Sequence, residues 1–391
     1  TRKFKMLFPS GFHEVLVSAS MAILGVGYTS DEELLFNKVD FSFSDADEWF
    51  NISGIDKKIL KNNESGDLGY QLRYVPQEPI VFELLDGYKL EVKFKASIDE
   101  MDKAHRSVIR ENLVLSILSD LDKPLDDFTD YVFKVGQFLS FITGKLINLN
   151  SLNGFSKILN SENNEISAKQ DIYYSSVFKS NEVKIDKTEE PLLKFTDIRH
   201  ISPDFFKNWM AAYEDLSPAL ALYFAYHLGA YRFLDSQFLA LAQGLETLHR
   251  RTSSELSMSE SDFEKMLSEI LDNCPPTHKE WLKMKLYFAN ELSLRKRLQD
   301  LFEPYIDVFG NKKDIKDIID KIVTTRNYLT HYSLELKERS STGSELLKIV
   351  KCMEALFIIR FLEIIGLDKE NLIEITKTSP ILIRNFKYIK N

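Results

Sequence analysis

The sequence predicts an α+β protein, with a β-rich N-terminal domain followed by an all-α helical bundle. Three observations carry this prediction. Residues 1–98 contain β-prone runs and a hairpin signal, residues 99–200 mix two patterns, and residues 201–391 repeat apolar side chains at helical spacing. We therefore divide the chain into a β-rich N-terminal domain at 1–98, a mixed helical and β connecting region at 99–200, and a helical domain at 201–391.

The clearest signal in the first region is a β-hairpin. Two β-prone runs, 80–85 and 88–94, flank the dipeptide Asp86-Gly87. An Asp-Gly pair between such runs is the strongest short-range hairpin signal. The chain opens at Thr1 rather than Met, within strand-rich sequence, so we expect the natural protein to begin upstream. Further β-prone runs lie at 14–19 and 41–44.

The connecting region combines helical and β patterns. Residues 123–143 repeat apolar side chains at steps of three and four, which predicts an amphipathic helix. The apolar residues spread over 106–119 also favour a helix. The run 153–169 is rich in Asn, Ser and Glu and predicts a loop. Strand-like runs flank that loop at 146–149 and 171–178.

From residue 201 onward the chain reads as a succession of helices. Ser202-Pro203-Asp204 suits a helix start, and Pro304 interrupts the pattern later. Gly310 breaks the chain before the helix that carries the chemistry. We expect helices at 204–214, 218–250, 261–273, 278–302, 313–337 and 343–366.

Composition narrows the classes of function. The 391 residues are 44% hydrophobic and 28% charged, which describes a folded globular protein. The net charge of −9 excludes a general nucleic-acid coat, so any RNA contact requires a local basic patch. The two cysteines, Cys274 and Cys352, argue against a disulfide framework and for a cytoplasmic protein. No run approaches the roughly 20 apolar residues of a membrane span, so we expect no membrane partner.

The residues that carry chemistry lie in the helix expected at 313–337. Asn327 and His331 are four residues apart and share a helix face, and Arg326 lies about 140° from His331 around the axis. RNA supplies its own nucleophile, the 2′-hydroxyl. Its cleavage needs a group that titrates near neutrality, as His does, and fixed positive charge for the phosphate, as Arg provides. Arg326, Asn327 and His331 are therefore the predicted catalytic residues, with no metal and no cofactor.

The run Arg326-Asn327-Tyr328-Leu329-Thr330-His331 resembles the Arg-Asn-x-x-x-His signature of HEPN ribonucleases. The wider pattern, from about Pro203 onward, resembles the Apea-like HEPN family of bacterial anti-phage proteins, and 238–250 resembles that family's long first helix. The resemblance implies a HEPN bundle that assembles as a homodimer or higher homo-oligomer. It also implies cleavage of RNA, with tRNA among the candidate substrates, to a cyclic phosphate and a 5′-hydroxyl. Abortive infection, with a phage-derived trigger, is the implied setting.

Four further residues are secondary candidates. Glu246 is a candidate acidic catalytic group, and the alternative is a salt-bridged helix residue. Arg250 is a candidate RNA contact, and the alternative is a cation that complements a helix dipole. Arg295 and Arg297, with Lys296 between them, form either an RNA-binding rail or a solvated helix face.

Two classes of function therefore remain open. In the first, the protein is an endoribonuclease with His331 as general acid/base and Arg326 as phosphate stabiliser. In the second, it is a non-catalytic RNA- or protein-binding scaffold that dimerises through its helical domain. The acidic net charge and the low specificity of Arg–His spacing alone motivate the second. The other histidines have no Cys or His at metal-ligand spacing, so no metal site is predicted.

Overall fold

The chain forms two compact units, Thr1–Ala211 and Ala212–Asn391. The computed structural model describes residues 2–8, 11–17, 21–25, 34–61, 68–98, 108–159, 165–174, 190–227, 229 and 231–390. Helix α4 (Phe205–His227) begins in the first unit and continues in the second. Across these ranges, no helix combines the length and the apolar character needed to cross a membrane.

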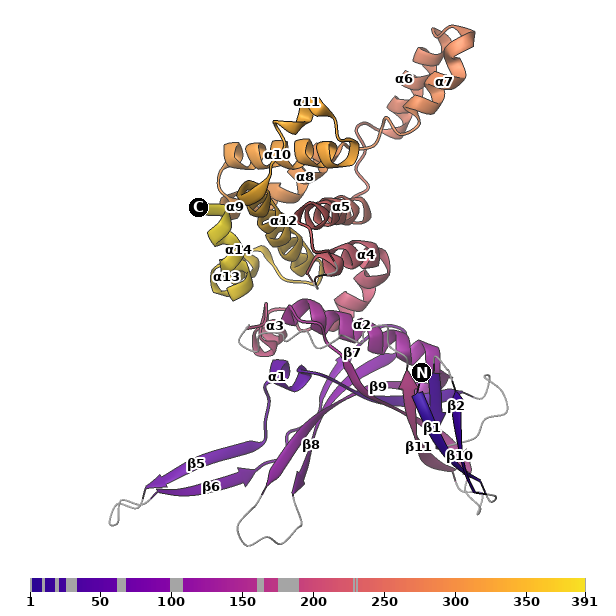
Figure 1. The fold of residues 1–391 in the computed structure, drawn as a ribbon, viewed down its shortest axis with the longest axis vertical. Coiled ribbons are helices and arrows are strands. Elements are labelled where there is room, and N and C mark those ends of the chain that lie inside the picture. Colours follow the sequence, from indigo (N-terminus) through magenta and orange to yellow (C-terminus); the bar gives the residue numbers. More distant parts are fainter. Residues whose placement is uncertain are drawn as a thin grey trace. The chain divides into compact units, whose positions relative to one another are not determined.

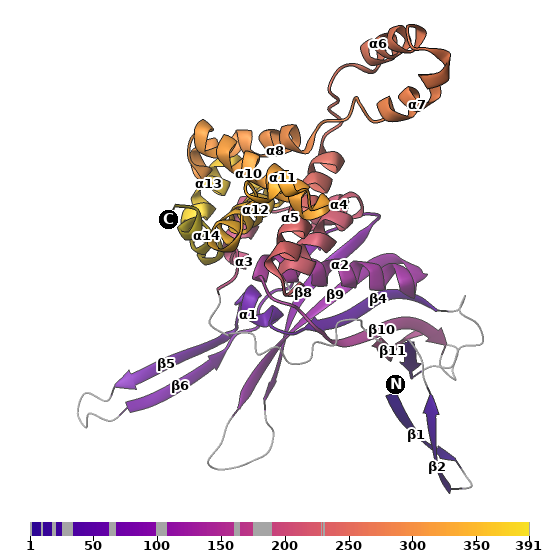
Figure 2. The same cartoon turned by 45° about the horizontal axis from the view of Figure 1, so that its top comes forward.

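The first unit is organised around a seven-stranded antiparallel sheet, which helix α2 (Leu125–Thr143) covers on one face (Figures 1 and 2). The sheet strands are β3 (Met21–Leu24), β4 (Leu35–Phe43), β7 (Ile80–Glu83), β8 (Tyr88–Ile98), β9 (Ile109–Pro124), β10 (Leu149–Leu159) and β11 (Glu165–Tyr174). Their order is β3-β11-β10-β4-β9-β8-β7, and α2 contacts β4 and β9. The unit also contains the hairpins β1 (Arg2–Phe8)/β2 (Gly11–Val17) and β5 (Ile55–Lys61)/β6 (Leu68–Tyr74), and the short helices α1 (Ala46–Phe50) and α3 (Phe195–Ile201).

The hairpin predicted at Asp86-Gly87 is confirmed. Strands β7 and β8 pair antiparallel on either side of it. Asp86 has φ 53° and Gly87 has φ 78°, and the tight hairpin turn requires positive φ at both central positions. The backbone N–H of Leu84 donates to the Tyr88 carbonyl at 2.9 Å and closes the ladder. Local turn chemistry therefore sets the register at this edge of the sheet.

Two predictions for the connecting region are wrong. The segment 106–119 was expected to be helical, but β9 occupies it from Ile109 onward. Leu115, Ser116 and Ile117 are all fully buried, so the centre of this strand is covered on both faces of the sheet. The run 153–169 was expected to be a loop, but β10 and β11 pair through most of it, because backbone hydrogen bonds build a ladder without requiring apolar side chains. Residues 160–164 lie outside the described residues.

The predicted helix at 123–143 is confirmed as α2, and it helps to form an aromatic core. The Trp49 ring lies 5.7 Å from the Phe138 ring, edge to face. Trp209, near the start of α4, donates a hydrogen bond from Nε1 to the Lys134 carbonyl at 2.9 Å. The α2 side chains at helical spacing are all buried: Phe128, Val132, Val135, Leu139 and Ile142. Because the sheet contains strands on both sides of residue 98, the domain boundary proposed there remains a prediction.

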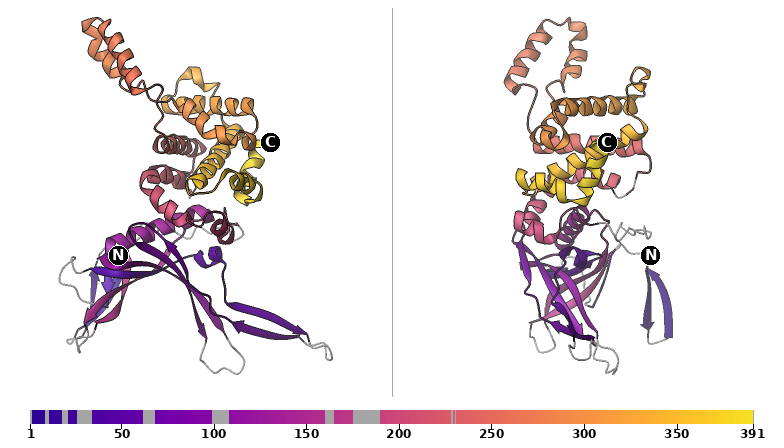
Figure 3. Two further views of the ribbon diagram at one scale, coloured as in Figure 1. Left: turned by 180° about the vertical axis from the view of Figure 1, so that it is seen from behind. Right: turned by 90° about the vertical axis from the view of Figure 1, so that its left-hand side faces the viewer.

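The second unit is helical, and α12 (Gly343–Ile364) forms its centre. Val350, Met353 and the whole run 355–359 are fully buried, so the middle of α12 is enclosed on all sides, as a core helix is. It contacts α5 and α14 (Figure 3). The remaining helices are α5 (Leu234–Thr252), α6 (Glu260–Asp272), α7 (Pro276–Leu286), α8 (Leu294–Phe302), α9 (Ile306–Phe309), α10 (Lys312–His331), α11 (Leu334–Lys337), α13 (Lys369–Thr378) and α14 (Pro380–Lys390), with a 3₁₀ turn at Glu303–Tyr305. The α+β fold class is therefore confirmed.

Several helix boundaries differ from the prediction. Pro218, expected to begin a helix, lies inside α4. The helix expected at 278–302 is divided into α7 and α8. The helix expected at 313–337 ends at His331, because Tyr332 adopts a left-handed φ of 51°. Apolar periodicity continues through such short connections, so it does not reveal where the backbone turns.

Candidate active site

The predicted catalytic residues lie in the last two turns of α10, a helix whose two ends are both well defined. The Asn311 side chain accepts hydrogen bonds from the backbone N–H groups of Lys313 and Asp314, at 2.9 and 3.1 Å. The Asp314 carboxylate accepts from the Asn311 N–H at 3.2 Å, which completes a capping box. At the far end the Tyr332 N–H donates to the Tyr328 carbonyl at 2.6 Å. The helix therefore ends immediately after His331.

Packing orients α10 about its own axis. The helix contacts α5, α8 and α12 through one buried stripe. Thr325, fully buried in that stripe, accepts a hydrogen bond from the Ser341 N–H at 2.9 Å. Because Arg326 and Asn327 follow Thr325 directly, this anchor determines the faces on which they lie. The buried stripe consists of Ile315, Ile319, Ile322, Thr325 and Leu329.

A groove of about 480 Å³ brings three predicted site residues together. Glu246 and Arg250 line it from α5, and Arg326 and Thr330 line it from α10. Each pair is spaced four residues apart, so each helix presents one face to the groove. The structure thus places the candidate acidic group on the first long helix beside the candidate phosphate-binding arginine of the motif.

Ion pairs hold Arg250 in this groove. Its Nη2 lies 3.1 Å from Glu246 Oε1, and its Nη1 contacts the Glu291 carboxylate. Burial opposes the charge, but hydrogen bonds to the two carboxylates outweigh it and raise the pKa of Arg250. The salt-bridge alternative for Glu246 is therefore present in the structure. Its carboxylate holds a guanidinium at the groove in which Arg326 lies.

The three motif residues are only partly assembled in one chain. Arg326 Nη1 donates to Asn327 Oδ1 at 3.3 Å, and both side chains are half-buried. His331 is exposed and does not line the groove, and no hydrogen bond or ion pair joins its imidazole to another residue of the described ranges. Beside it, Tyr332 is 67% exposed and Leu334 is 83% exposed. The imidazole therefore lies on an open, partly apolar surface.

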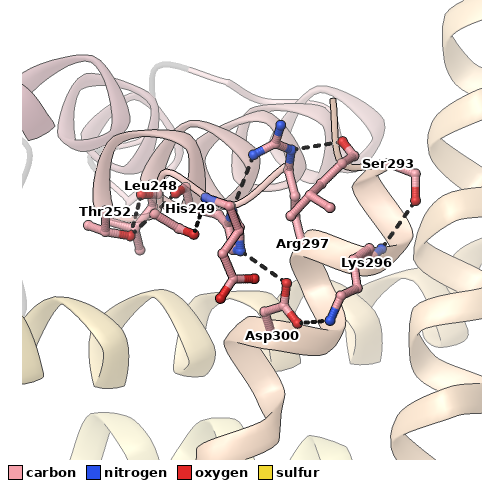
Figure 4. Close-up of polar contacts among 10 residues, drawn as sticks. Leu248, His249, Thr252, Ser293, Lys296, Arg297 and Asp300 are labelled. Carbon is pink, nitrogen blue, oxygen red and sulfur yellow. Dashed lines mark hydrogen bonds and ion pairs between the residues drawn. The ribbon is translucent and has the colours of Figure 1, made fainter. Parts of the chain in front are cut away.

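A second histidine, His249, is buried on α5 and is next in sequence to the groove residue Arg250; Figure 4 shows its polar contacts. His249 of α5 is 3% exposed, and Arg297 of α8 donates from Nη1 to its Nδ1 at 3.2 Å. His249 Nε2 lies 3.3 Å from Asp300 Oδ2. Burial, reinforced by the Arg297 charge, lowers the pKa of His249. Because a guanidinium only donates hydrogen bonds, Nδ1 must be the acceptor, so His249 is neutral with its proton on Nε2.

This network changes the interpretation of the predicted RNA-binding rail. Arg297 is 4% exposed and also donates from Nε to the Leu292 carbonyl at 3.0 Å, so its guanidinium joins helices and does not face solvent. Arg295 pairs with Asp320 of α10. The structure therefore does not bring these two arginines into the groove with Arg326, and the burial of Arg297 argues against its predicted contact with RNA.

The sequence patterns did not predict the bridging role of His249 or the ion pair that Glu291 forms with Arg250. The sequence does contain a signal that His249 is buried. His249 follows the fully buried Leu245 by four residues, so the apolar period of α5 places His249 on the core side. Glu291 lies in the connection between α7 and α8, where no period applies.

Comparisons with known proteins match both halves of the chain. The family model described as ApeA N-terminal domain 1 matches residues 2–209, more than half of the chain, and the one described as Apea-like HEPN matches residues 239–371. The second range contains the whole groove and the motif, and HEPN domains as a class are generally ribonuclease-like. A search of curated proteins and a search of solved structures each found no match. The chain is a member of the ApeA family, with an ApeA N-terminal domain 1 followed by an Apea-like HEPN domain.

Proposed function

We propose that this protein is a metal-independent HEPN endoribonuclease that cleaves RNA as a homodimer in a cytoplasmic anti-phage, abortive-infection system. The supporting observation is the presentation of Arg326, Asn327 and His331 by the last turns of α10, with Arg326 opening onto the groove that holds Glu246 and Arg250. Exposure of His331 leaves its imidazole accessible to a large substrate.

The proposed reaction is an internal transesterification. The 2′-hydroxyl oxygen forms a bond to the adjacent phosphorus while the bond from phosphorus to the 5′-oxygen breaks. A base takes the 2′-hydroxyl proton, an acid protonates the leaving 5′-oxygen, and the products are a cyclic phosphate and a 5′-hydroxyl. His331 serves as general acid/base. Arg326 stabilises the negative charge that develops on the phosphoryl oxygens, and Asn327 orients that guanidinium through their hydrogen bond.

Dimerisation follows from the need for two proton-transfer groups. Each chain supplies one histidine in the motif, whereas the base and the acid must act on opposite sides of the phosphate. A second copy supplies the second imidazole. The exposed apolar side chains of Tyr332 and Leu334 beside His331 support this proposal, because contiguous exposed apolar surface marks interaction sites.

Within the groove, Glu246 positions Arg250. The ion pair leaves a second guanidinium near Arg326. Two arginines at one groove suit a phosphodiester, since each presents a planar fork of donors that matches phosphate oxygens. Under this proposal Glu246 is a positioning residue, and Arg250 contacts the RNA backbone.

The decisive experiment compares wild-type protein with His331→Ala and with His278→Ala, which replaces an exposed histidine of α7. Each is incubated with total bacterial RNA in EDTA, and the cut ends are mapped across all RNA classes, including tRNA. We expect cyclic-phosphate ends from the wild type and from His278→Ala, and none from His331→Ala. Equal cleavage by His331→Ala rejects the assignment of His331.

The same assay repeated in lysate from phage-infected cells tests the proposed trigger. An enzyme that awaits activation cuts only in that lysate, and the His331→Ala protein again cuts nothing. If the wild type cuts no RNA under either condition, the scaffold alternative replaces the nuclease.

A further inference from the structure

A second groove lies in the HEPN unit, on a different side of α10 from the Glu246–Arg326 groove. It has a volume of about 730 Å³ and is formed by α10, α12 and α14. That volume lies within the range of small-molecule sites and is large enough for a short stretch of an extended chain. The groove is lined by Lys321, Ser344, Glu345, Lys348, Arg384, Lys387 and Tyr388.

The groove is strongly positive, although the whole chain carries a net charge of −9. Four of its lining side chains are cationic and one is anionic. The one carboxylate, Glu345, accepts a hydrogen bond from Lys321, and this bond lowers its pKa. Lys348 and Lys387 form no ion pair within the described part of the chain. The charges of these two lysines are therefore not balanced by an ion pair in this part of the chain.

An aromatic side chain accompanies these cations. Tyr388 of α14 is 45% exposed at the groove. Cations that follow a backbone, interleaved with aromatic rings on which bases stack, are the physical signature of single-stranded nucleic-acid binding. A site for an acidic protein segment needs the charge but has no comparable need for the ring.

The groove lies close enough to the Arg326–His331 motif for one RNA strand to reach both. Lys321 precedes Arg326 by five residues and His331 by ten, which corresponds to about 7.5 Å and about 15 Å along the α10 axis. A strand bound in the groove can therefore continue along α10 to His331. Arg295 and Arg297, the arginines first expected to form such a rail, are committed to Asp320 and His249.

We propose that the groove between α10, α12 and α14 binds the backbone of single-stranded RNA. Lys348, Arg384 and Lys387 contact phosphates, and Tyr388 stacks on a base. The inference rests on the proposed function for the identity of the ligand as RNA, and it adds an RNA-binding surface outside the motif. It predicts that substrates long enough to reach the groove are bound more tightly than those that occupy only the motif.

The test measures binding without cleavage. A fluorescent 12-nucleotide single-stranded RNA is titrated by anisotropy, over a range of salt concentrations, against His331→Ala protein with and without Lys348→Glu/Lys387→Glu. We expect affinity to fall by about tenfold or more, and the slope of log affinity against log salt to become shallower by about 1.4, since each lost phosphate contact removes about 0.7. Tyr388→Ala is expected to weaken binding by about fivefold or more, and Tyr388→Phe is expected to bind normally.

The matched control is Lys283→Glu/Lys285→Glu, which makes the same charge change on exposed positions of α7. Control protein is expected to bind like the parent. Lys348→Gln/Lys387→Gln, with thermal unfolding of every variant, separates lost contacts from lost folding.

Equal binding by the folded groove variant and the control overturns the proposal, even if the wild type is an active nuclease. Displacement of the RNA by poly-glutamate, together with normal binding by Tyr388→Ala, also overturns it and indicates an acidic protein ligand. A specific loss in the groove variant supports it, even if the wild type cleaves nothing.

Discussion

The guanidinium of Arg297 donates a hydrogen bond from Nη1 to Nδ1 of His249 at 3.2 Å, and this bond joins α8 to α5 through two residues that are 48 positions apart in sequence. His249 in turn lies against Asp300, one turn along α8 from Arg297. The network binds α5, which carries Glu246 and Arg250, to α8, which packs on α10. Through the buried side chains of His249 and Arg297, it therefore links the helices that carry the groove residues.

Arg297→Ala is expected to destabilise the fold. It leaves the Leu292 carbonyl and His249 Nδ1 buried without their donor, and we expect a cost of about 2–3 kcal/mol in the free energy of unfolding. Arg295→Ala breaks a half-exposed ion pair and is expected to cost no more than about 1 kcal/mol. Urea unfolding measures both. A near-neutral Arg297→Ala protein with weakened RNA binding would restore the rail interpretation.

Arg326→Lys is expected to lower the cleavage rate constant by about 100-fold while leaving the fold intact. An ammonium keeps the charge but cannot present the planar fork of donors, and removal of one charge-stabilising donor typically costs this much. Single-turnover cleavage in EDTA measures the rate constant. Arg232→Lys, at an exposed position outside the groove, is the control and is expected to cleave normally. Full activity in Arg326→Lys would show that the fork is not required.

Tyr332→Asp/Leu334→Asp is expected to convert the proposed homodimer to a monomer. Each side chain is mostly exposed in the single chain, so the substitutions leave the core alone but place charge in the proposed interface. Sedimentation velocity reports the oligomeric state. Leu121→Asp, at a position that is 67% exposed in the other unit, is the control and should remain dimeric. A dimer that survives the double substitution would place the interface elsewhere.

Glu354 provides a prediction about pH. This carboxylate of α12 is 2% exposed, and it accepts hydrogen bonds from Tyr226 Oη at 2.7 Å and Lys351 Nζ at 2.8 Å. Burial alone would raise the pKa of Glu354. The hydrogen bond from His227 and the charge of Lys351 outweigh burial and lower the pKa to about 2. The carboxylate therefore stabilises the fold when it is ionised.

Because the pKa of Glu354 is lower in the folded than in the unfolded chain, its stabilisation is fully present above pH 4.5 and is lost as pH falls toward 2. Glu354→Gln is expected to cost about 3–5 kcal/mol at pH 7, since it leaves Lys351 without its partner. The difference in stability from wild type should shrink between pH 4.5 and 3. Glu370→Gln, at an exposed position of α13, should show no such difference. A constant difference across that window would contradict the assignment.

Much of the fold was predictable from short spacings. Asp86-Gly87 predicted its own hairpin, and the apolar period from Phe128 to Ile142 predicted α2. The segment of β9 around Leu115 was wrongly predicted to be a helix, because five apolar residues close together fit a helix face and a strand equally well. The end of α10 was misplaced because a left-handed tyrosine, Tyr332, terminates it without glycine or proline.

For the candidate site, short-range spacing was enough to predict that Arg326, Asn327 and His331 lie on one helix, with Asn327 and His331 on a common face. That conclusion needs only the geometry of five or six consecutive residues. Three other features depend on how the helices pack: Arg326 opens onto Glu246 and Arg250, Arg297 is buried against His249, and Tyr388 joins Lys348 in a basic groove. These partners come from separate helices, whose mutual orientation depends on how their buried faces pack around α12, and no local spacing encodes that packing.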